Sequence, residues 1–403
     1  MKKILFANGN YNDIPLVEAA HRLGCYVITS GNDPSGEAHP FADEYCPCNY
    51  ADREQLLRLA EEKQVDAVCS CGNDLAAVSA AYVCERLGLP GHDTWKVSRL
   101  FHEKDEFKRL CEELDLPTPR SEAFTDLEEA LAFAAKCSYP KIVKPVDLGG
   151  GKGISVARSA EEGKAAVELA FCRSLHKHVV IEDYIEGTQH GFICYIRNGK
   201  VAFDYSTNDY SYLNPFMVWM GSGYPADGYA EVRGQIIGDV EKMSAATRMA
   251  DGFLTIQYMM MDGRPYYIET MRRCLGNLHF KCISRDLGID LYELFVATEL
   301  GMDCSRYLDS VSPSGLRSGF MGIYARQNGI FRGVSFDGAF EEKFFDSLYL
   351  VKPGHEITHY LDEKLGMVWF SFASESERRA FLERRMDLFR VTVEDTDGKA
   401  VSK

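Results

Sequence analysis

A glycine-rich loop behind a lysine-bearing strand is the most informative chemical pattern in this sequence. Residues 139–145 read YPKIVKP and carry Lys144, and residues 148–153 read LGGGKG. Within five positions this loop holds four glycines: Gly149, Gly150, Gly151 and Gly153. Without Cβ atoms, such a segment can turn backbone N–H groups toward an anion. The pattern predicts a phosphate-cradling loop, although a plain hairpin connection would also fit it when taken alone. It is not a P-loop, because Gly rather than Ser or Thr follows the lysine.

A second pattern places two polar side chains on a predicted hairpin. Residues 252–261 and 264–269 are largely apolar and flank the turn sequence Asp262-Gly263. A three-residue loop centred on Gly263 would set Gln257 directly opposite Glu269, with Cβ atoms about 4.5–5.5 Å apart. Hard oxygen ligands of this kind suit Mg²⁺, which binds one or two protein oxygens and completes its shell with phosphate and water. A polar cross-strand pair at the sheet surface is the alternative.

The elements that must position these residues fall into three predicted regions. Residues 1 to about 95 alternate short apolar strands with amphipathic helices, which favours a parallel βαβ sheet. After the LPTP linker at 116–119, longer strands and the turn sequences Asn198-Gly199, Asp262-Gly263 and Asn328-Gly329 favour antiparallel hairpins and an α+β domain. From about residue 313, glycine-rich β segments precede a charged helix near 375–389, which indicates a third, mostly β module.

Composition narrows the class of protein. The chain has 403 residues, with 45 basic and 60 acidic side chains and a formal charge of −15. Because no long Lys/Arg run is present, we expect neither a nucleic-acid partner nor an anionic membrane partner. The thirteen cysteines are scattered and odd in number, and only four apolar residues follow the first lysines. We therefore expect a cytoplasmic protein with reduced thiols and no transmembrane segment.

Taken together and in order, the motifs resemble the ATP-grasp superfamily. The resemblance rests on Lys104, on Lys144 before the glycine loop, on residues 180–187 (VIEDYIEG), and on Gln257 followed twelve residues later by Glu269. It covers roughly residues 1–300 and is similar to the carbamoyl-phosphate synthetase large-chain and biotin carboxylase-like branch of carboxylate-amine ligases.

The fold that this resemblance implies is a combination of α/β and α+β architecture. It has an N-terminal parallel pre-ATP-grasp domain at 1–95 and an ATP-grasp domain at 96–312. The ATP-grasp domain would have a small lobe at about 118–187 and a large lobe at about 188–312, followed by a small β-rich C-terminal module at 313–403.

The resemblance also implies an ATP site. Lys104 and Lys144 would contact the nucleotide phosphates, and the loop at 149–153 would close over them. The hinge that reads the adenine would comprise Glu182, Asp183, Tyr184 and Ile185. Gln189 stands where the family commonly has a ribose-binding Glu, and an amide can still bond the ribose hydroxyls.

By the same resemblance, Gln257 and Glu269 would hold Mg²⁺ or Mn²⁺. Met271 occupies the position of the usual third ligand, an Asn, and a thioether is a poor Mg²⁺ ligand. Arg273, four residues after Glu269, matches the family's arginine that faces the transferring phosphoryl group. Arg272 is an equally cationic competitor for that role.

The implied activity is that of an ATP-dependent ligase. It would activate a small carboxylate as an acyl-phosphate, join it to an amine or other nucleophile, and release ADP and phosphate. A small-molecule phosphotransferase and a nucleotide-binding protein without turnover are the alternatives. The expected partners are a small carboxylate and an amine, with a homodimer as a possible assembly.

The sequence gives weaker evidence for the site of the second substrate. Residues 203–229 carry many aromatic side chains among Gly, Pro and Asn, which favours an ordered functional loop over that substrate. Asn8, Gly9, Asn73 and Asp74 follow predicted parallel strands, where open α/β sheets bind ligands. Helix capping is an equally good reading of Asn73 and Asp74.

Overall fold

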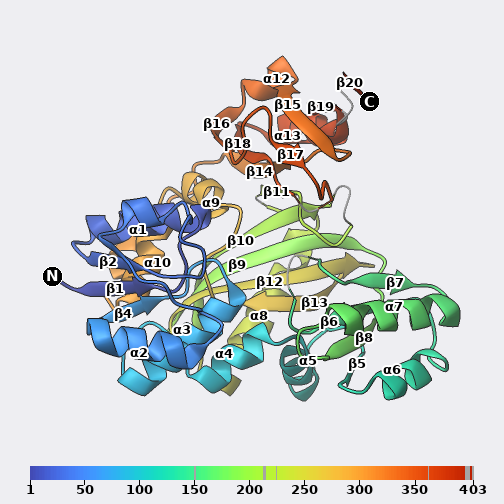
Figure 1. Ribbon diagram of the computed structural model, residues 1–403, viewed down its shortest axis with the longest axis horizontal. Coiled ribbons are helices and arrows are strands. Elements are labelled where there is room, and N and C mark those ends of the chain that lie inside the picture. The colour runs from blue at the N-terminus through green and yellow to red at the C-terminus, as the bar shows by residue number, and fades with distance from the viewer. Residues whose placement is uncertain (149–150, 212–214, 224, 362, 395–399, 402–403) are drawn as a thin grey trace.

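The computed structural model describes residues 1–148, 151–211, 215–223, 225–361, 363–394 and 400–401. Figure 1 shows three bodies around one long sheet: an N-terminal α/β unit, a small four-stranded unit and a β-rich C-terminal unit. Within the described residues, no helix is both long enough and apolar enough to cross a bilayer. The parallel N-terminal sheet and the antiparallel sheets that follow confirm the predicted mixture of α/β and α+β architecture.

The N-terminal unit is built on a parallel sheet in the order β3-β2-β1-β4. Its strands are β1 (Lys3–Phe6), β2 (Tyr26–Thr29), β3 (Glu44–Tyr45) and β4 (Ala67–Cys69), and its helices are α1 (Ile14–Arg22), α2 (Arg53–Lys63) and α3 (Asp74–Leu87). Short 3₁₀ helices cover Tyr11–Asp13 and His39–Phe41. Asn73 caps α3 by accepting from the Ala76 N–H at 3.1 Å, and Gly88 ends it at φ 66°. Local sequence thus sets both ends of a helix that borders the site.

A long antiparallel sheet forms the middle of the molecule, in the order β13-β12-β9-β10-β11-β14-β18-β16. Its strands are β9 (Thr188–Arg197), β10 (Lys200–Tyr210), β11 (Met220–Gly223), β12 (Gly252–Met261), β13 (Arg264–Met271), β14 (Arg317–Ile323), β16 (Phe344–Tyr349) and β18 (Gly366–Phe372). Phe192, Cys194 and Ile196 alternate toward one face, where they pack with α8 (Tyr229–Thr247). Ile193 and Tyr195 point to the other face, which packs on α9 (Phe280–Leu287), α10 (Leu291–Glu299) and the N-terminal unit. The side-chain period of two therefore buries both faces of this part of the sheet.

The hairpin of β12 and β13 reaches the predicted pairing by a different turn. Asp262 and Gly263 form a two-residue turn at φ 52° and 72°, so that Met261 faces Arg264. A bulge between Gln257 and Tyr258 then shifts the register by one residue. Gln257 consequently does lie opposite Glu269, although the loop has two residues and not the three that we expected.

The small unit holds the lysine-bearing strand. Its sheet has the order β5-β8-β6-β7, with β5 (Ser121–Phe124), β6 (Lys141–Pro145), β7 (Ser155–Ala157) and β8 (Val179–Asp183). Helices α6 (Leu127–Ala134) and α7 (Ala160–Arg173) pack on it, and Val143, Val179 and Ile181 fill the layer between them. Helices α4 (Trp95–His102) and α5 (Lys104–Glu113) connect this unit to the N-terminal unit.

The C-terminal unit continues the long sheet and adds a second one. Strand β14 pairs with β11, so hydrogen bonding runs across residue 312 without a break; the domain division at that residue stays a prediction. The second sheet has the order β17-β15-β19-β20, and its members are β17 (Glu356–Ile357), β15 (Gly329–Phe336), β19 (Phe389–Glu394) and β20 (Ala400–Val401). Helices α11 (Ser305–Leu308), α12 (Gly338–Glu341) and α13 (Glu375–Glu383) and a 3₁₀ turn at Arg385–Asp387 complete this part of the chain.

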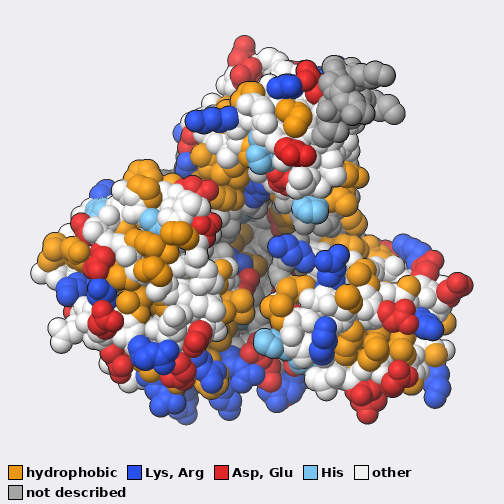
Figure 2. All heavy atoms as spheres, in the orientation of Figure 1, with side chains coloured by type: hydrophobic (Ala, Val, Ile, Leu, Met, Phe, Trp, Pro, Cys, Tyr) orange, Lys and Arg blue, Asp and Glu red, His pale blue; other side chains and the backbone are white. Residues whose placement is uncertain are grey.

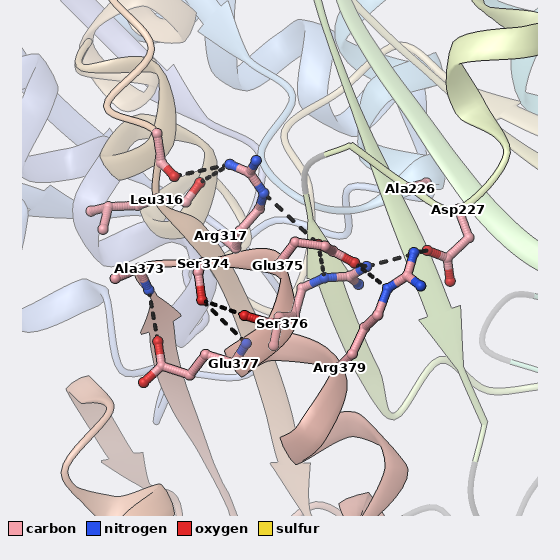
Figure 3. A network of polar contacts seen from close by, with 12 residues as sticks. Ala226, Asp227, Leu316, Arg317, Ala373, Ser374, Glu375, Ser376, Glu377 and Arg379 are labelled. Atoms are coloured by element: carbon pink, nitrogen blue, oxygen red, sulfur yellow. Dashed lines mark hydrogen bonds and ion pairs between the residues drawn. The ribbon is translucent and has the colours of Figure 1, made fainter.

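An ion-pair network joins α13 to the segment before α8 (Figure 3). Arg378 is 1% exposed and donates to Glu375 at 2.6 Å and to Asp227 at 3.2 Å. Its neighbour Arg379 is exposed and also bonds Glu375, at 2.7 Å. One buried and one exposed arginine therefore meet the same carboxylate.

Two sequence expectations about local structure are wrong. Asn328-Gly329 is not a hairpin turn, because the strands it separates, β14 and β15, belong to different sheets. The segment 203–229 is not one long loop, because its first part completes β10, residues 220–223 form β11, and α8 begins at Tyr229. Buried positions of Tyr205, Trp219 and Tyr229 explain much of its aromatic content; Tyr212 and Tyr224 lie outside the described residues.

Candidate active site

Strands β6 and β8 place a lysine and a glutamate on one face of the small sheet. The register pairs Ile142 with Glu182 and Lys144 with Val180, so that Lys144 and Glu182 are diagonal neighbours. Lys144 Nζ donates to Glu182 Oε2 at 2.8 Å, and both side chains are buried. Glu182 Oε1 has no hydrogen-bond partner among the described residues. A buried carboxylate oxygen in that state calls for a donor from a ligand or from water.

Lys108 joins this pair, and the sequence reasoning missed it. Its ammonium donates to Thr118 Oγ1 and to the Tyr267 carbonyl, both at 2.9 Å, and lies 3.8 Å from Glu182 Oε2. Burial lowers the pKa of Lys108 to about 8, although Glu182 acts against this. Burial alone would raise the pKa of Glu182, but Lys108 and Lys144 outweigh it and lower that pKa. The available sequence signal was the spacing of four from Lys104, which puts both lysines on one face of α5.

Lys104 contacts the segment that leads into the glycine loop. Its Nζ donates to the Leu148 carbonyl at 2.9 Å and to the Val146 carbonyl at 3.4 Å. Gly149 and Gly150 lie outside the described residues. Gly151 and Gly153 have φ of +75° and +72°, and a Cβ on Gly151 would come within 2.8 Å of the Phe216 carbonyl oxygen. Glycine is thus required at Gly151 by both backbone conformation and packing.

The predicted hinge follows directly after Glu182. Asp183 accepts from Lys141 Nζ at 2.5 Å, and the Tyr184 N–H donates to the Pro140 carbonyl at 3.3 Å. Ile185 is half-buried. These contacts tie the hinge backbone to the start of β6, and they leave its adenine-reading role a prediction.

Gln257 and Glu269 lie opposite each other on one face of the long sheet. Their neighbours across the sheet are Gly191 on β9 and Thr207 on β10. Both side chains are half-buried, and among the described residues no three His, Cys, Asp or Glu side chains converge as a metal site would require. Two hard oxygens with room beside them fit a cation that takes its other ligands from phosphate and water.

Met271 stands on the same face, two residues further along β13. It pairs with Thr255, is 8% exposed, and belongs to the apolar core that joins the sheet to the N-terminal unit. The position of the usual third ligand is therefore part of the core, which agrees with the poor fit of a thioether to Mg²⁺.

The two arginines after β13 have different environments. Arg272 forms a buried ion pair with Asp93 at 2.7 Å and donates to the Phe253 and Ala250 carbonyls, each at 2.7 Å. Arg273 binds Asp74 with both ends of its guanidinium, at 2.6 and 3.0 Å. The Arg272 guanidinium bonds a buried carboxylate and two backbone carbonyls. Arg273 instead bonds the Asp74 carboxylate, at the edge of the N-terminal sheet.

Four N-terminal residues were predicted to lie near the substrate: Asn8, Gly9, Asn73 and Asp74. Of these, Asp74 contacts a predicted site residue, Arg273. Asn73 caps α3, and Gly9 packs against the His39 ring, where a Cβ would lie only 2.1 Å from a ring carbon. Asn8 makes no side-chain bond that assigns it to the site.

Asp209 is a second residue that the sequence reasoning missed. Strand β10 pairs it with Gln189 on β9 and Gly221 on β11, so it shares the face of Gln257 and Glu269. It accepts from Thr207 Oγ1 at 2.8 Å, and burial raises its pKa to about 7 although that bond acts against the shift. Figure 2 shows a hollow between the N-terminal unit, the small unit and the C-terminal unit.

Comparison with known proteins shows which proteins this chain is similar to. Residues 102–215 match the family described as the phosphoribosylglycinamide synthetase ATP-grasp (A) domain. A carbamoyl phosphate synthase large chain of Clostridium beijerinckii is 22% identical over 306 residues, which are 72% of this chain and 27% of that protein. A formate-dependent phosphoribosylglycinamide formyltransferase of Paraburkholderia xenovorans is 30% identical over 181 residues, 42% of this chain and 43% of that protein.

Solved structures extend the likeness to the whole fold. An L-amino acid ligase from Bacillus licheniformis superposes with a TM-score of 0.81 at 21% identity, covering 98% of this chain and 99% of that one. The biotin carboxylase domain of Hydrogenobacter thermophilus 2-oxoglutarate carboxylase gives 0.75 at 20% identity, covering 97% and 91%. The chain spans less than half the length of the curated relatives named above. The chain therefore carries an ATP-grasp domain match at residues 102–215 and shares its fold over nearly its full length with these solved structures.

Proposed function

We propose that this chain is an ATP-dependent ligase that activates a small carboxylate and joins it to an amine, such as an amino acid. The observation that carries the proposal is the Gln257–Glu269 pair on the sheet face of an ATP-grasp fold. This pair offers hard oxygen ligands, and no group of three His, Cys, Asp or Glu side chains that could hold a metal occurs in the described part of the chain, so phosphate oxygens would complete the shell. Mg²⁺ or Mn²⁺ held there would supply charge neutralisation for the β- and γ-phosphates.

The nucleotide would lie between the small unit and the long sheet. Lys104 and Lys144 would contact its phosphates, and the loop at 149–153 would cover them. Residues 182–185 would read the adenine, and Gln189 would bond the ribose. The unsatisfied Glu182 Oε1 supports this placement, because it needs a donor of the kind that an adenine amino group provides.

The chemistry would then need position and charge rather than a side-chain nucleophile. A substrate carboxylate oxygen attacks the γ-phosphorus of ATP. The bond between that phosphorus and the oxygen that bridges it to the β-phosphate breaks, which gives ADP and an acyl-phosphate. The amine nitrogen next attacks the acyl carbon, phosphate leaves, and the nitrogen loses a proton. Arg273 would neutralise the phosphoryl group in both steps, and the closed loop would exclude water from the acyl-phosphate.

The assembly and location of the chain are part of the same proposal. A dimer is named for the 2-oxoglutarate carboxylase domain that shares this fold, and we propose a homodimer here. The thirteen free cysteines support a reducing, cytoplasmic location.

The test is release of ADP and phosphate from Mg-ATP in the presence of pooled small acids and amines, with product mass detection. Wild type should need two co-substrates and form a product one water lighter than their sum. Glu269→Ala should reduce the rate about 100-fold or more, and chelation of divalent ions should abolish it. The matched control is Glu61→Ala, which removes an exposed carboxylate from α2 and should retain full activity.

Other outcomes separate the remaining functions. A phosphorylated product with ADP but no condensation would establish a phosphotransferase. Nucleotide binding without ADP release in any pool would favour a binding protein and would contradict the ligase proposal.

A further inference from the structure

Lys364 lies where the N-terminal unit, the loop after β13 and the C-terminal unit meet. It belongs to the segment between β17 and β18 in the C-terminal unit. Its Nζ donates to Asn277 Oδ1, in the loop after β13, and to Tyr11 Oη, which follows β1 and is 3.3 Å away. The Met367 sulfur lies 3.9 Å from the same nitrogen. One ammonium group therefore contacts residues from all three regions of the chain.

This cation lacks a counter-ion in the described part of the chain. Several other half-buried or buried lysines have a carboxylate partner: Lys141 pairs with Asp183, Lys144 with Glu182 and Lys281 with Asp346. Lys364 has only an amide, a phenol and a thioether, and burial lowers its pKa to about 8. Because a buried charge without a partner is unfavourable, an anion at this place would be strongly stabilised.

The two neutral partners of Lys364 keep donors for such an anion. A lysine ammonium can only donate, so Asn277 Oδ1 and Tyr11 Oη both accept from it. The Asn277 amide hydrogens and the Tyr11 hydroxyl hydrogen therefore stay available, and neither has an acceptor among the described residues. Both side chains are half-buried. The Lys364 ammonium, the Asn277 amide and the Tyr11 hydroxyl thus offer three donor groups within one contact network.

The loop after β13 connects this place to Arg273. Asn277 is four residues beyond Arg273 on that loop. The loop is held against the N-terminal unit by Asp74 at its Arg273 end and by Asn12, which accepts from the Leu278 N–H at 3.3 Å, at its other end. An anion bound at Lys364 would therefore sit one short loop away from the group expected to face the transferring phosphate.

We propose that Lys364, Asn277 and Tyr11 bind a carboxylate of the substrate that does not itself react. This inference rests on the proposed ligase function and narrows its substrates to those with a spectator carboxylate. That carboxylate is either the second one of a dicarboxylic acid or the α-carboxylate of an amino acid that serves as the amine. The two sources share their chemistry and differ in which co-substrate carries it.

The test uses the full chain, with Lys364→Met to remove the charge and retain the stem. Succinate is compared with butyrate as the acid, and L-alanine with L-alaninamide as the amine. If the site binds the acid, Lys364→Met should raise the KM for succinate about 10- to 100-fold and leave the KM for butyrate unchanged. If it binds the amine, the same change should appear for L-alanine and not for L-alaninamide. The KM for ATP should stay unchanged in both cases. Lys364→Arg should restore part of the loss. Lys352→Met, at an exposed lysine of the same unit, is the matched control.

Calorimetry separates this inference from the ligase proposal. Succinate, L-glutamate and L-alanine are titrated into wild type and variants with a non-hydrolysable ATP analogue and Mg²⁺ present. If an acid binds in a Lys364-dependent manner but no ADP is released in the turnover assay, the carboxylate site is supported and the ligase proposal is rejected. Ligase turnover with unchanged KM values in Lys364→Met would reject the site alone, as would the absence of binding of all three acids.

A second variant covers the case in which Lys364→Met does not fold. Asn277→Asp would place a carboxylate against the Lys364 ammonium. It should retain the contact of Lys364 with the loop after β13 and weaken the binding of a substrate carboxylate about 10-fold or more. An unchanged affinity for all three acids in a folded Asn277→Asp protein would overturn the proposal.

Discussion

Glu182 carries the only carboxylate that contacts both Lys108 and Lys144 within the described residues. Lys144 is the cation expected to reach the nucleotide, whereas Lys108 also bonds Thr118 and Tyr267 and is held in place by them. Lys108 can therefore neutralise Glu182 when Lys144 turns to a phosphate. Without Lys108, Lys144 would be the only lysine paired with Glu182, and that ion pair would hold the Lys144 ammonium away from a phosphate.

Lys108→Met should accordingly weaken ATP binding about 10-fold or more. It should also lower the free energy of unfolding by about 3–5 kcal/mol, because it breaks a buried charge cluster. ATP titration by calorimetry and urea unfolding measure the two effects. Lys164→Met, at an exposed lysine of α7, is the control for loss of one positive charge. Wild-type ATP affinity in folded Lys108→Met would contradict this role.

Asp209 makes stability depend on pH. Its pKa rises from 3.8 to about 7 in the folded chain because burial disfavours the charged form. The folded state therefore binds a proton more tightly than the unfolded state, and the stability from this group is lost as pH rises from about 4 to about 7. Asp209→Asn removes that loss. The variant should gain in melting temperature relative to wild type between pH 4 and pH 8, and an equal difference at both pH values would disprove the assignment.

At the scale of elements, the loop after β13 gives two adjacent arginines different partners. Arg272 is directed inward to Asp93 and two backbone carbonyls, and Arg273 is directed to Asp74 at the end of the N-terminal sheet. The alternation of side chains at the end of a strand explains why neighbours point in different directions.

Replacing each arginine by methionine should therefore give opposite results. Arg272→Met should lower the free energy of unfolding by about 3–5 kcal/mol, since it leaves Asp93 buried and unpaired. Arg273→Met should retain more of the stability, because Asp74 is partly exposed, and should reduce turnover about 100-fold or more. Each variant serves as the control for the other. Equal losses of stability with equal turnover would show that the loop is not divided in this way.

The hairpin and the small sheet show how far local sequence determines an element. The residue types in the β12–β13 turn and in β6 predict a hairpin and a lysine-bearing strand, and both are present. The bulge lies on β13, where Ile268 is left between the Gln257–Glu269 and Tyr258–Tyr267 pairs, and the alternation of residue types along β12 and β13 gave no signal for it.

At the scale of the whole molecule, the C-terminal unit is attached by the long sheet and by the network in Figure 3. Arg378 is buried between Glu375 and Asp227, whereas Arg379 reaches Glu375 from solvent. The burial of its stem and head makes Arg378 a packing residue as well as an ion-pair partner.

Arg378→Ala should lower the free energy of unfolding by about 2–4 kcal/mol. Arg379→Ala, in the same turn of α13, should cause no measurable change, because exposed ion pairs contribute little. Urea unfolding followed by tryptophan fluorescence reports on this region, since Trp219 lies in the C-terminal core. Equal effects of the two substitutions would contradict the importance of burial.

The sequence by itself determined the features whose partners are close along the chain. Residue types and local spacing were sufficient for the parallel N-terminal sheet, the lysine-bearing strand β6 and the β12–β13 hairpin, because strands, turns and hairpins follow from short-range geometry.

Only the tertiary structure decided the roles of Lys108, Arg272, Asp209 and Lys364. Lys108 meets Tyr267 and Lys364 meets Tyr11 across 159 and 353 residues of chain, and Arg272 meets Asp93 across 179. Asp209 depends on its place in a sheet whose strand order is not the chain order. Burial and long-range pairing set the surroundings of these groups, and both arise only when distant segments are packed together.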